Sequence, residues 1–278
     1  MKRKTLTVII FLGLVALINF ALAMPNLSSG KAKPVAKTVK IPATAIRVTD
    51  HIFRLGTAID AVDGKTVEGY AILHYAKQKG SAKTKPATCY GFLSQGAKWK
   101  SSEPWLINPL NQSSLGADSV FNNLAGDILK WEDAADGVIG NNRGTNILGN
   151  GSITDLSLTA DMVSPDGKNE VYFADIEDPN TIAMTIIWGI FSGPLPGRQL
   201  VEWDQVYDDV DYPWSLTGES GKMDFDNIAT HELGHSVGMA DLYTSGCGEE
   251  TMYGYAGYGE IKKRDLNVGD IAGINKLY

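Results

Sequence analysis

The chain has 278 residues, of which 44% are hydrophobic and 21% are charged, a composition that excludes a disordered or fibrous protein. Its formal net charge is −7, and residues 101–278 carry 28 acidic against 9 basic side chains, which argues against binding to nucleic acid. Residues 24–100 have the opposite balance, with 13 Lys and Arg against 4 Asp and Glu. At short range the basic part would be attracted to the acidic part.

The N-terminus has the pattern of a secretory signal peptide. Lys2, Arg3 and Lys4 precede an apolar run, and Ala21-Leu22-Ala23 supplies a small-residue cleavage site. We predict that residues 1–23 are removed and that the protein is secreted. The alternative is an uncleaved N-terminal anchor at the cell surface, because the run is nearly long enough to span a bilayer.

Residues 24–86 are predicted to form a basic linker and one β-hairpin. The segment 25–45 is rich in Lys, Ala, Pro, Ser and Thr, and two β-prone runs flank Asp63-Gly64. This part is either a pro-segment that covers an acidic cleft or a spacer that holds the rest of the chain off the cell surface. His51 and His74 lie in the hairpin region and are expected to be ordinary polar positions.

Residues 87–278 are predicted to form a larger domain of mixed structure. Apolar residues from Val120 to Trp131 recur close to helical spacing, and a Gly- and Asn-rich loop follows at 137–151. Asp224 or Asp226 is expected to cap a later helix, and Asn267 is expected to cap the last one. Predicted strands lie at 104–109, 169–176, 181–190 and 198–210.

Two cysteines, Cys89 and Cys247, are predicted to form a disulfide, because pairing is the default outside the cell. Such a bond would close a very long loop of the unfolded chain. The alternative is a free Cys89 thiolate that occupies a metal site and keeps it inactive.

The segment "HELGHSVGMAD" at 231–241 carries the strongest chemical signal in the chain. On a helix, His231 and His235 lie on one face and can reach a common zinc ion. Glu232 can then meet a metal-bound water without itself binding the metal. Gly238 can end the helix with a positive φ, so that Asp241 offers a third ligand.

This pattern resembles the metzincin clan of zinc endopeptidases, and within it the matrixin and snapalysin types. Met252 in "CGEETMYGY" is the candidate Met-turn residue, and "LNVGDIAGINKLY" is similar to the closing helix of matrixin domains. The matrixin latency motif P-R-C-G-x-P-D is absent from the sequence. The resemblance covers residues 89–278 and implies an α+β, zincin-like fold. Its twisted mixed sheet and helices lie above a cleft, with the Met-turn and the C-terminal helix in a smaller subdomain below.

The resemblance also implies an activity, hydrolysis of protein or peptide substrates with Glu232 as general base. One zinc ion would be held by His231, His235 and Asp241. "TIAMTIIWG" at 181–189 would be the edge strand with which an extended substrate pairs. Its continuous apolar run is equally consistent with an interior strand.

Two other functions fit parts of the pattern. A non-catalytic zinc-binding surface protein would need no general base, and another zinc hydrolase, such as a deacetylase, is disfavoured by the peptidase-type motif. Calcium is a further candidate ligand, for Asp208-Asp209-Asp211 or for the region from Asp155 to Asp178. The alternative for these carboxylates is a solvated acidic face. The sequence does not indicate which oligomeric state the protein has.

Overall fold

A mixed β-sheet organises the computed structural model, which describes residues 37–76, 88–141 and 143–278. Within these ranges, ten strands form one sheet and two short strands pair separately. The order across the sheet is β2-β3-β4-β8-β9-β7-β5-β6, with β1 beside β7 and β12 beside β4. The strands are β1 (Thr38–Val39), β2 (Ile46–Arg47), β3 (Ile52–Ile59), β4 (Thr66–Ala76), β5 (Trp105–Asn108), β6 (Gly151–Ile153), β7 (Asn169–Ile176), β8 (Thr181–Ile190), β9 (Gln199–Asp208) and β12 (Tyr255–Ala256), with β10 (Trp214–Ser215) and β11 (Met223–Asp224) apart.

Strands β6, β5, β7 and β9 are parallel to one another, whereas β8 runs antiparallel to β9. The strands predicted at 169–176 and 181–190 have the bounds expected from their apolar runs. Every residue of β8 before Ile190 is buried. A strand of this kind is covered on both faces, which explains its continuous apolar sequence.

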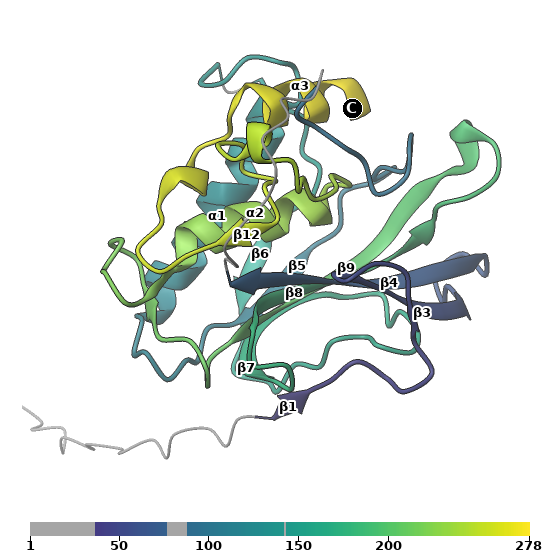
Figure 1. Ribbon diagram of the computed structural model, residues 1–278. Coiled ribbons are helices and arrows are strands. Elements are labelled where there is room, and N and C mark those ends of the chain that lie inside the picture. Colours follow the sequence, from purple (N-terminus) through teal and green to yellow (C-terminus); the bar gives the residue numbers. More distant parts are fainter. Residues whose placement is uncertain (1–36, 77–87, 142) are drawn as a thin grey trace, which may run out of the picture. The chain divides into compact units, whose positions relative to one another are not determined.

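Three helices in the described part of the chain lie on one face of the sheet (Figure 1). They are α1 (Ala117–Ala134), α2 (Phe225–Ser236) and α3 (Val268–Leu277). In α1, Val120, Leu124, Ile128 and Trp131 point into the core, as their spacing predicts. Leu129, which the pattern also placed on the apolar face, is 63% exposed, because it follows Ile128 and lies one residue outside the buried stripe.

The sheet separates two hydrophobic clusters. One contains the inner faces of α1 and α2, with Trp131, Trp203 and Phe225 among its members. The other lies on the second face of the sheet and includes Val67 and Trp188. This mixed arrangement, with helices on one side of a twisted sheet, is the α+β, zincin-like class expected from the sequence.

The hairpin predicted around Asp63-Gly64 is present as β3 and β4, and Gly64 has a φ of +72° at its turn. It is part of the main sheet, because β4 pairs with β8 from Glu68 to Tyr75. Of the two positions left open for residues 181–189, edge and interior, the structure has the interior one: β8 lies between β4 and β9. The described residues all belong to one unit, Pro34–Tyr278.

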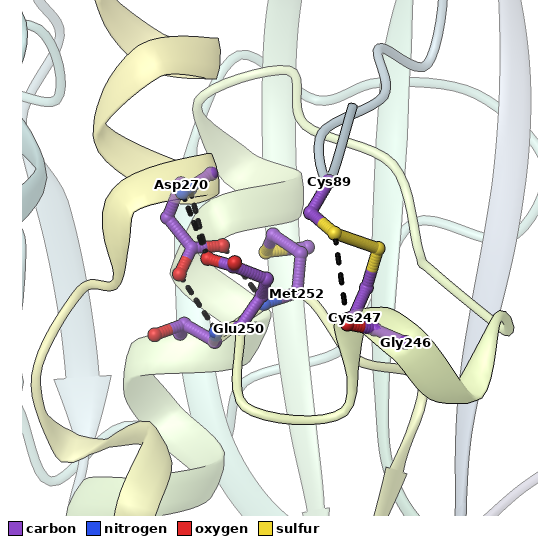
Figure 2. Close-up of a disulfide and its surroundings, with 8 residues drawn as sticks. Cys89, Gly246, Cys247, Glu250, Met252 and Asp270 are labelled. Atoms are coloured by element: carbon purple, nitrogen blue, oxygen red, sulfur yellow. Dashed lines mark hydrogen bonds between the residues drawn. A yellow bond between two sulfur atoms is a disulfide. The ribbon is translucent and has the colours of Figure 1, made fainter. Parts of the chain in front are cut away.

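Cys89 and Cys247 form a disulfide, with 5.4 Å between their Cα atoms (Figure 2). A free Cys89 thiolate as a latency ligand is therefore excluded. The predicted signal peptide at 1–23 and the predicted boundary at 86/87 lie outside the described residues. Among the helices that the structure does describe, none is long and apolar enough to cross a membrane.

Candidate metal centre

Helix α2 begins and ends where the sequence predicts. Of the two predicted caps, Asp224 is the N-cap, and its side chain accepts a hydrogen bond from the Asn227 amide at 3.1 Å. Gly238 has a φ of +104°, and a Cβ there would lie 2.9 Å from the Ala97 carbonyl oxygen. Only glycine fits this turn, which brings the chain back to Asp241.

Three predicted ligands converge at the C-terminal half of α2. His231 Nε2 lies 3.2 Å from Asp241 Oδ1, and His235 Nε2 lies 3.5 Å from the same oxygen. The two histidine side chains are at most 1% exposed, and that of Asp241 is 3% exposed. These three atoms have no hydrogen-bond partner among the described residues. Buried polar atoms are rarely left unpaired, so the donor set fits a divalent cation such as zinc.

Surrounding groups orient each of these ligands. His231 Nδ1–H donates to the Thr251 carbonyl at 2.7 Å, and His235 Nδ1–H donates to the Met239 carbonyl at 3.0 Å. Since a carbonyl can only accept, each ring in its neutral form carries its proton on Nδ1 and leaves Nε2 with a free lone pair. Tyr243 donates its hydroxyl to Asp241 Oδ2 at 2.8 Å, which leaves Oδ1 directed at the two imidazoles.

Burial and charge set the protonation of this cluster. Burial lowers the pKa of His231 to about 4, so its ring is neutral. Burial alone would raise the pKa of Asp241, but contact with His235 and His231 holds it well below its usual range. Burial would lower the pKa of His235, but contact with Asp241 raises it, so a metal would displace a proton from this ring. A neutral imidazole and an ionised carboxylate are the forms that bind a metal.

Glu232 lies next to the cluster without joining it. It is fully buried, Thr185 donates its hydroxyl to Oε2 at 2.5 Å, and Oε1 has no hydrogen-bond partner in the described part of the chain. Burial raises its pKa to about 7, while His235 and the Thr185 hydroxyl act in the opposite direction. A carboxylate that is held at one oxygen and free at the other can accept a proton.

Met252, the candidate Met-turn residue, packs against Gly234 of α2. A Cβ added to Gly234 would overlap Met252 Sδ and lie 2.8 Å from Trp131 Cζ2. Asp270, at the start of α3, accepts hydrogen bonds from the Thr251 amide at 2.7 Å and the Met252 amide at 3.1 Å (Figure 2). This carboxylate therefore fixes the turn that also supplies the Thr251 carbonyl to His231.

His74 is the residue of this region that sequence reasoning missed. It comes from β4, its side chain is 1% exposed, and its ring centroid lies 4.0 Å from that of His231. Its Nδ1 is 3.8 Å from Glu232 Oε1, and neither ring nitrogen has a hydrogen-bond partner among the residues described. The available signal was a histidine directly after the apolar run Ala71-Ile72-Leu73, which is typical of a buried strand.

Tyr243 and Thr185 were also missed, and no local pattern marks either of them. His51 does not contact the metal cluster but stacks on Tyr243, with 4.5 Å between ring centroids.

Two groups of carboxylates lie away from this centre. One consists of Asp161, Asp166 and Glu202, and the other of Asp175, Asp208 and Asp211. In the second group, Asp208 accepts hydrogen bonds from the amides of Ile176, Val210 and Asp211. In the first group, Glu202 Oε1 is buried and without a hydrogen-bond partner among the described atoms.

One comparison with known proteins gives a match. Residues 195–278 match the family model for matrixin, and this region includes α2, Asp241, Met252 and α3. No curated protein matches the chain.

Proposed function

Because the chain contains a matrixin-like metallopeptidase domain, we propose that it is a secreted zinc-dependent endopeptidase. The observation that carries this proposal is the convergence of His231 Nε2, His235 Nε2 and Asp241 Oδ1, three buried atoms that face one another and have no hydrogen-bond partner within the described chain. These atoms would hold one zinc ion. Bound there, zinc would supply the Lewis acidity that activates water and polarises the peptide carbonyl.

Glu232 is the proposed general base. Its Oε2 is fixed by the Thr185 hydroxyl, so that Oε1 is the atom that takes the proton from the attacking water. The same carboxyl group then delivers this proton to the nitrogen of the departing amine. A purely structural zinc site would have no use for a buried carboxylate beside it. For this reason we favour a peptidase over a non-catalytic zinc-binding surface protein.

Met252 is proposed as the apolar floor below the metal. Its packing against Gly234 and the hydrogen bond from its backbone amide to the Asp270 carboxylate support this position. The proposed substrates are proteins or peptides. Export would follow from the signal peptide at 1–23, with 24–86 as an N-terminal part and 87–278 as the catalytic part. The proposed division at 86/87 separates two parts of the sequence that share one sheet, because β4 of the N-terminal part pairs with β8 of the catalytic part.

A calcium ion is proposed at Asp161, Asp166 and Glu202. Carboxylate oxygens are the ligands that calcium prefers. Burial raises the pKa of Glu202 to about 10, with Asp204 adding to the effect, so a calcium ion bound here would displace the proton of this carboxyl group.

The exported protein, recovered from the medium, tests the proposed function in two forms, the full chain and the chain from which residues 24–86 have been removed, each incubated with a peptide library. Cleavage by either form supports the proposal. We expect cleavage at internal bonds, loss of cleavage with a chelator and recovery after zinc is added back. Cleavage that persists after the metal has been removed, or release of terminal residues only, would contradict the proposal. Mass spectrometry of the products distinguishes these outcomes.

A further inference from the structure

The proposed active site is closed in the structure. The side chains of His231 and Glu232 are fully buried, and that of His235 is 1% exposed. An endopeptidase must admit an extended peptide to its base and metal ligands, so some part of the chain lies where the substrate belongs. The element closest to Glu232 from the N-terminal part is β4, which brings His74 to within 3.8 Å of Glu232 Oε1.

Strand β4 is held on both sides, as a bound peptide would be. It runs antiparallel to β8 and parallel to β12, which it meets at Tyr75 and Ala76. Ile72 lies opposite Thr185, the residue that donates to Glu232. Without β4, β8 would present a free hydrogen-bonding edge directly beside the general base, and extended peptides bind to such edges.

His74 fills the space next to the proposed base. Its ring packs against His231, and both of its nitrogens lie without a hydrogen-bond partner in the described structure. A structural histidine this deeply buried would ordinarily be hydrogen-bonded. Its position is explained if the ring takes the place of the peptide group that a substrate would bring to Glu232.

We propose that the hairpin β3–β4 is a built-in inhibitor: β4 occupies the substrate groove between β8 and β12, and His74 covers the active site. This inference rests on the proposed peptidase function. It implies that the full chain is latent and that activity requires β4 to leave β8. It also gives the direction of the substrate, antiparallel to β8 and parallel to β12.

Burial of the hairpin makes the latent state stable. Val67, Ala71 and Leu73 of β4 pack into the same cluster as Met184 and Trp188 of β8. Displacement of β4 would expose this apolar surface, so the strand does not leave spontaneously to any large extent.

The chain offers a substitution that loosens β4 without touching the site. A Cβ at Gly69 would lie 2.6 Å from the ring of Trp188, so Gly69→Val should push β4 away from β8. His74→Ala removes the covering ring and leaves the strand. Thr66→Ala, at an exposed position of the same strand, is the matched control.

The test uses the purified full chain loaded with zinc, and it measures by calorimetry the affinity for a dipeptide hydroxamate, a zinc-directed probe. We expect weak binding in the wild type and in Thr66→Ala, and at least tenfold tighter binding in Gly69→Val and His74→Ala. Equal affinity in all four proteins would overturn the inference. If Gly69→Val does not fold, as judged by circular dichroism, His74→Ala alone decides.

Zinc content and peptide hydrolysis are measured on the same samples. If the two variants gain hydroxamate affinity but hydrolyse no peptide, the inhibitor role stands and the proposed peptidase activity fails. If no protein in the series binds zinc, the proposed function fails and the inhibitor role falls with it. Gain of both affinity and hydrolysis supports both.

Discussion

At the scale of single residues, the three proposed ligands and the proposed base each have one polar atom fixed by a hydrogen bond and one polar atom without a hydrogen-bond partner in the described chain. The backbone carbonyls fix one nitrogen of each motif histidine, Tyr243 fixes one oxygen of Asp241, and Thr185 fixes one oxygen of Glu232. The remaining atom of each group points into a shared, buried space. This pattern separates the proposed roles of ligand and base.

Asp241→Ala and Glu232→Ala should therefore have different effects, one on zinc binding and the other on catalysis. We expect Asp241→Ala to lose zinc, because two imidazoles alone make an incomplete site. Glu232→Ala should keep one zinc per chain and, when both it and its reference protein also carry His74→Ala to uncover the site, lose about 10²–10⁴-fold in kcat/KM. Metal analysis beside kinetics on a peptide substrate measures both. Glu249→Ala, at a side chain that is 82% exposed, is the control. Loss of zinc from Glu232→Ala would assign that carboxylate as a ligand and contradict its role as base.

At the scale of elements, α2 and the turn around Met252 depend on one glycine. Gly234 lies between the two motif histidines, and its missing side chain leaves room for Met252. The turn is held from the other side by Asp270 of α3, whose pKa is raised by burial although it accepts three amide hydrogen bonds. The helix, the turn and α3 thus form one packed unit.

We expect Gly234→Ala to lower the free energy of unfolding by about 1–3 kcal/mol, because the new methyl group overpacks the contact with Met252 and Trp131. Gly126→Ala in α1 is the matched control, since nothing lies within 4 Å of its added Cβ. The control should be stabilised by about 0.5–1 kcal/mol from helix propensity alone. Denaturant unfolding measures both changes. A gain in stability from Gly234→Ala would show that the methionine moves aside freely.

At the scale of the whole molecule, the disulfide joins parts of the chain that are 158 residues apart. It ties the segment at Cys89 to the loop that precedes Met252 (Figure 2). The carboxylates of Asp161, Asp166 and Glu202 also bring together distant parts of the chain. Asp161 and Asp166 come from one loop, and Glu202 comes from strand β9.

The double variant Cys89→Ala/Cys247→Ala should unfold at a lower temperature than the wild type. Loss of a cross-link over this separation is expected to cost about 2–5 kcal/mol in the chain-entropy account. Scanning calorimetry with and without reductant measures the effect. Reductant should lower the Tm of the wild type and leave that of the variant unchanged. An equal effect of reductant on both proteins would contradict this assignment.

Glu202 predicts a dependence of stability on pH in calcium-free solution. The pKa of Glu202 in the folded protein, about 10, lies above its ordinary value of 4.5. Its contribution to the free energy of unfolding is therefore complete below pH 4.5 and is lost as pH rises toward the folded pKa. We expect Tm to fall between about pH 5 and pH 9, and to fall less in Glu202→Gln. Added calcium should raise Tm most at the alkaline end. Glu249→Gln is the exposed control, and identical profiles for the wild type and Glu202→Gln would contradict the prediction.

The sequence by itself determined what depends on chain neighbours. The spacing of His231 and His235 on a helix, the N-cap at Asp224 and the positive φ at Gly238 are local features, and the structure has each of them. The apolar runs of β7 and β8 likewise gave their bounds. Two cysteines allow a single pairing, and this pairing is present.

Only the tertiary structure decided which strand lies beside β8 and therefore what covers Glu232. The periodicity of a strand shows which side chains are buried but not which partner buries them, because that choice depends on packing between segments distant in the chain. Residues 51–75 read as an isolated hairpin in sequence, and the second strand of this hairpin lies against β8 because both strands bury apolar side chains in one cluster. That packing brings His74 to the candidate metal centre from more than 150 residues away, a distance over which no local pattern operates.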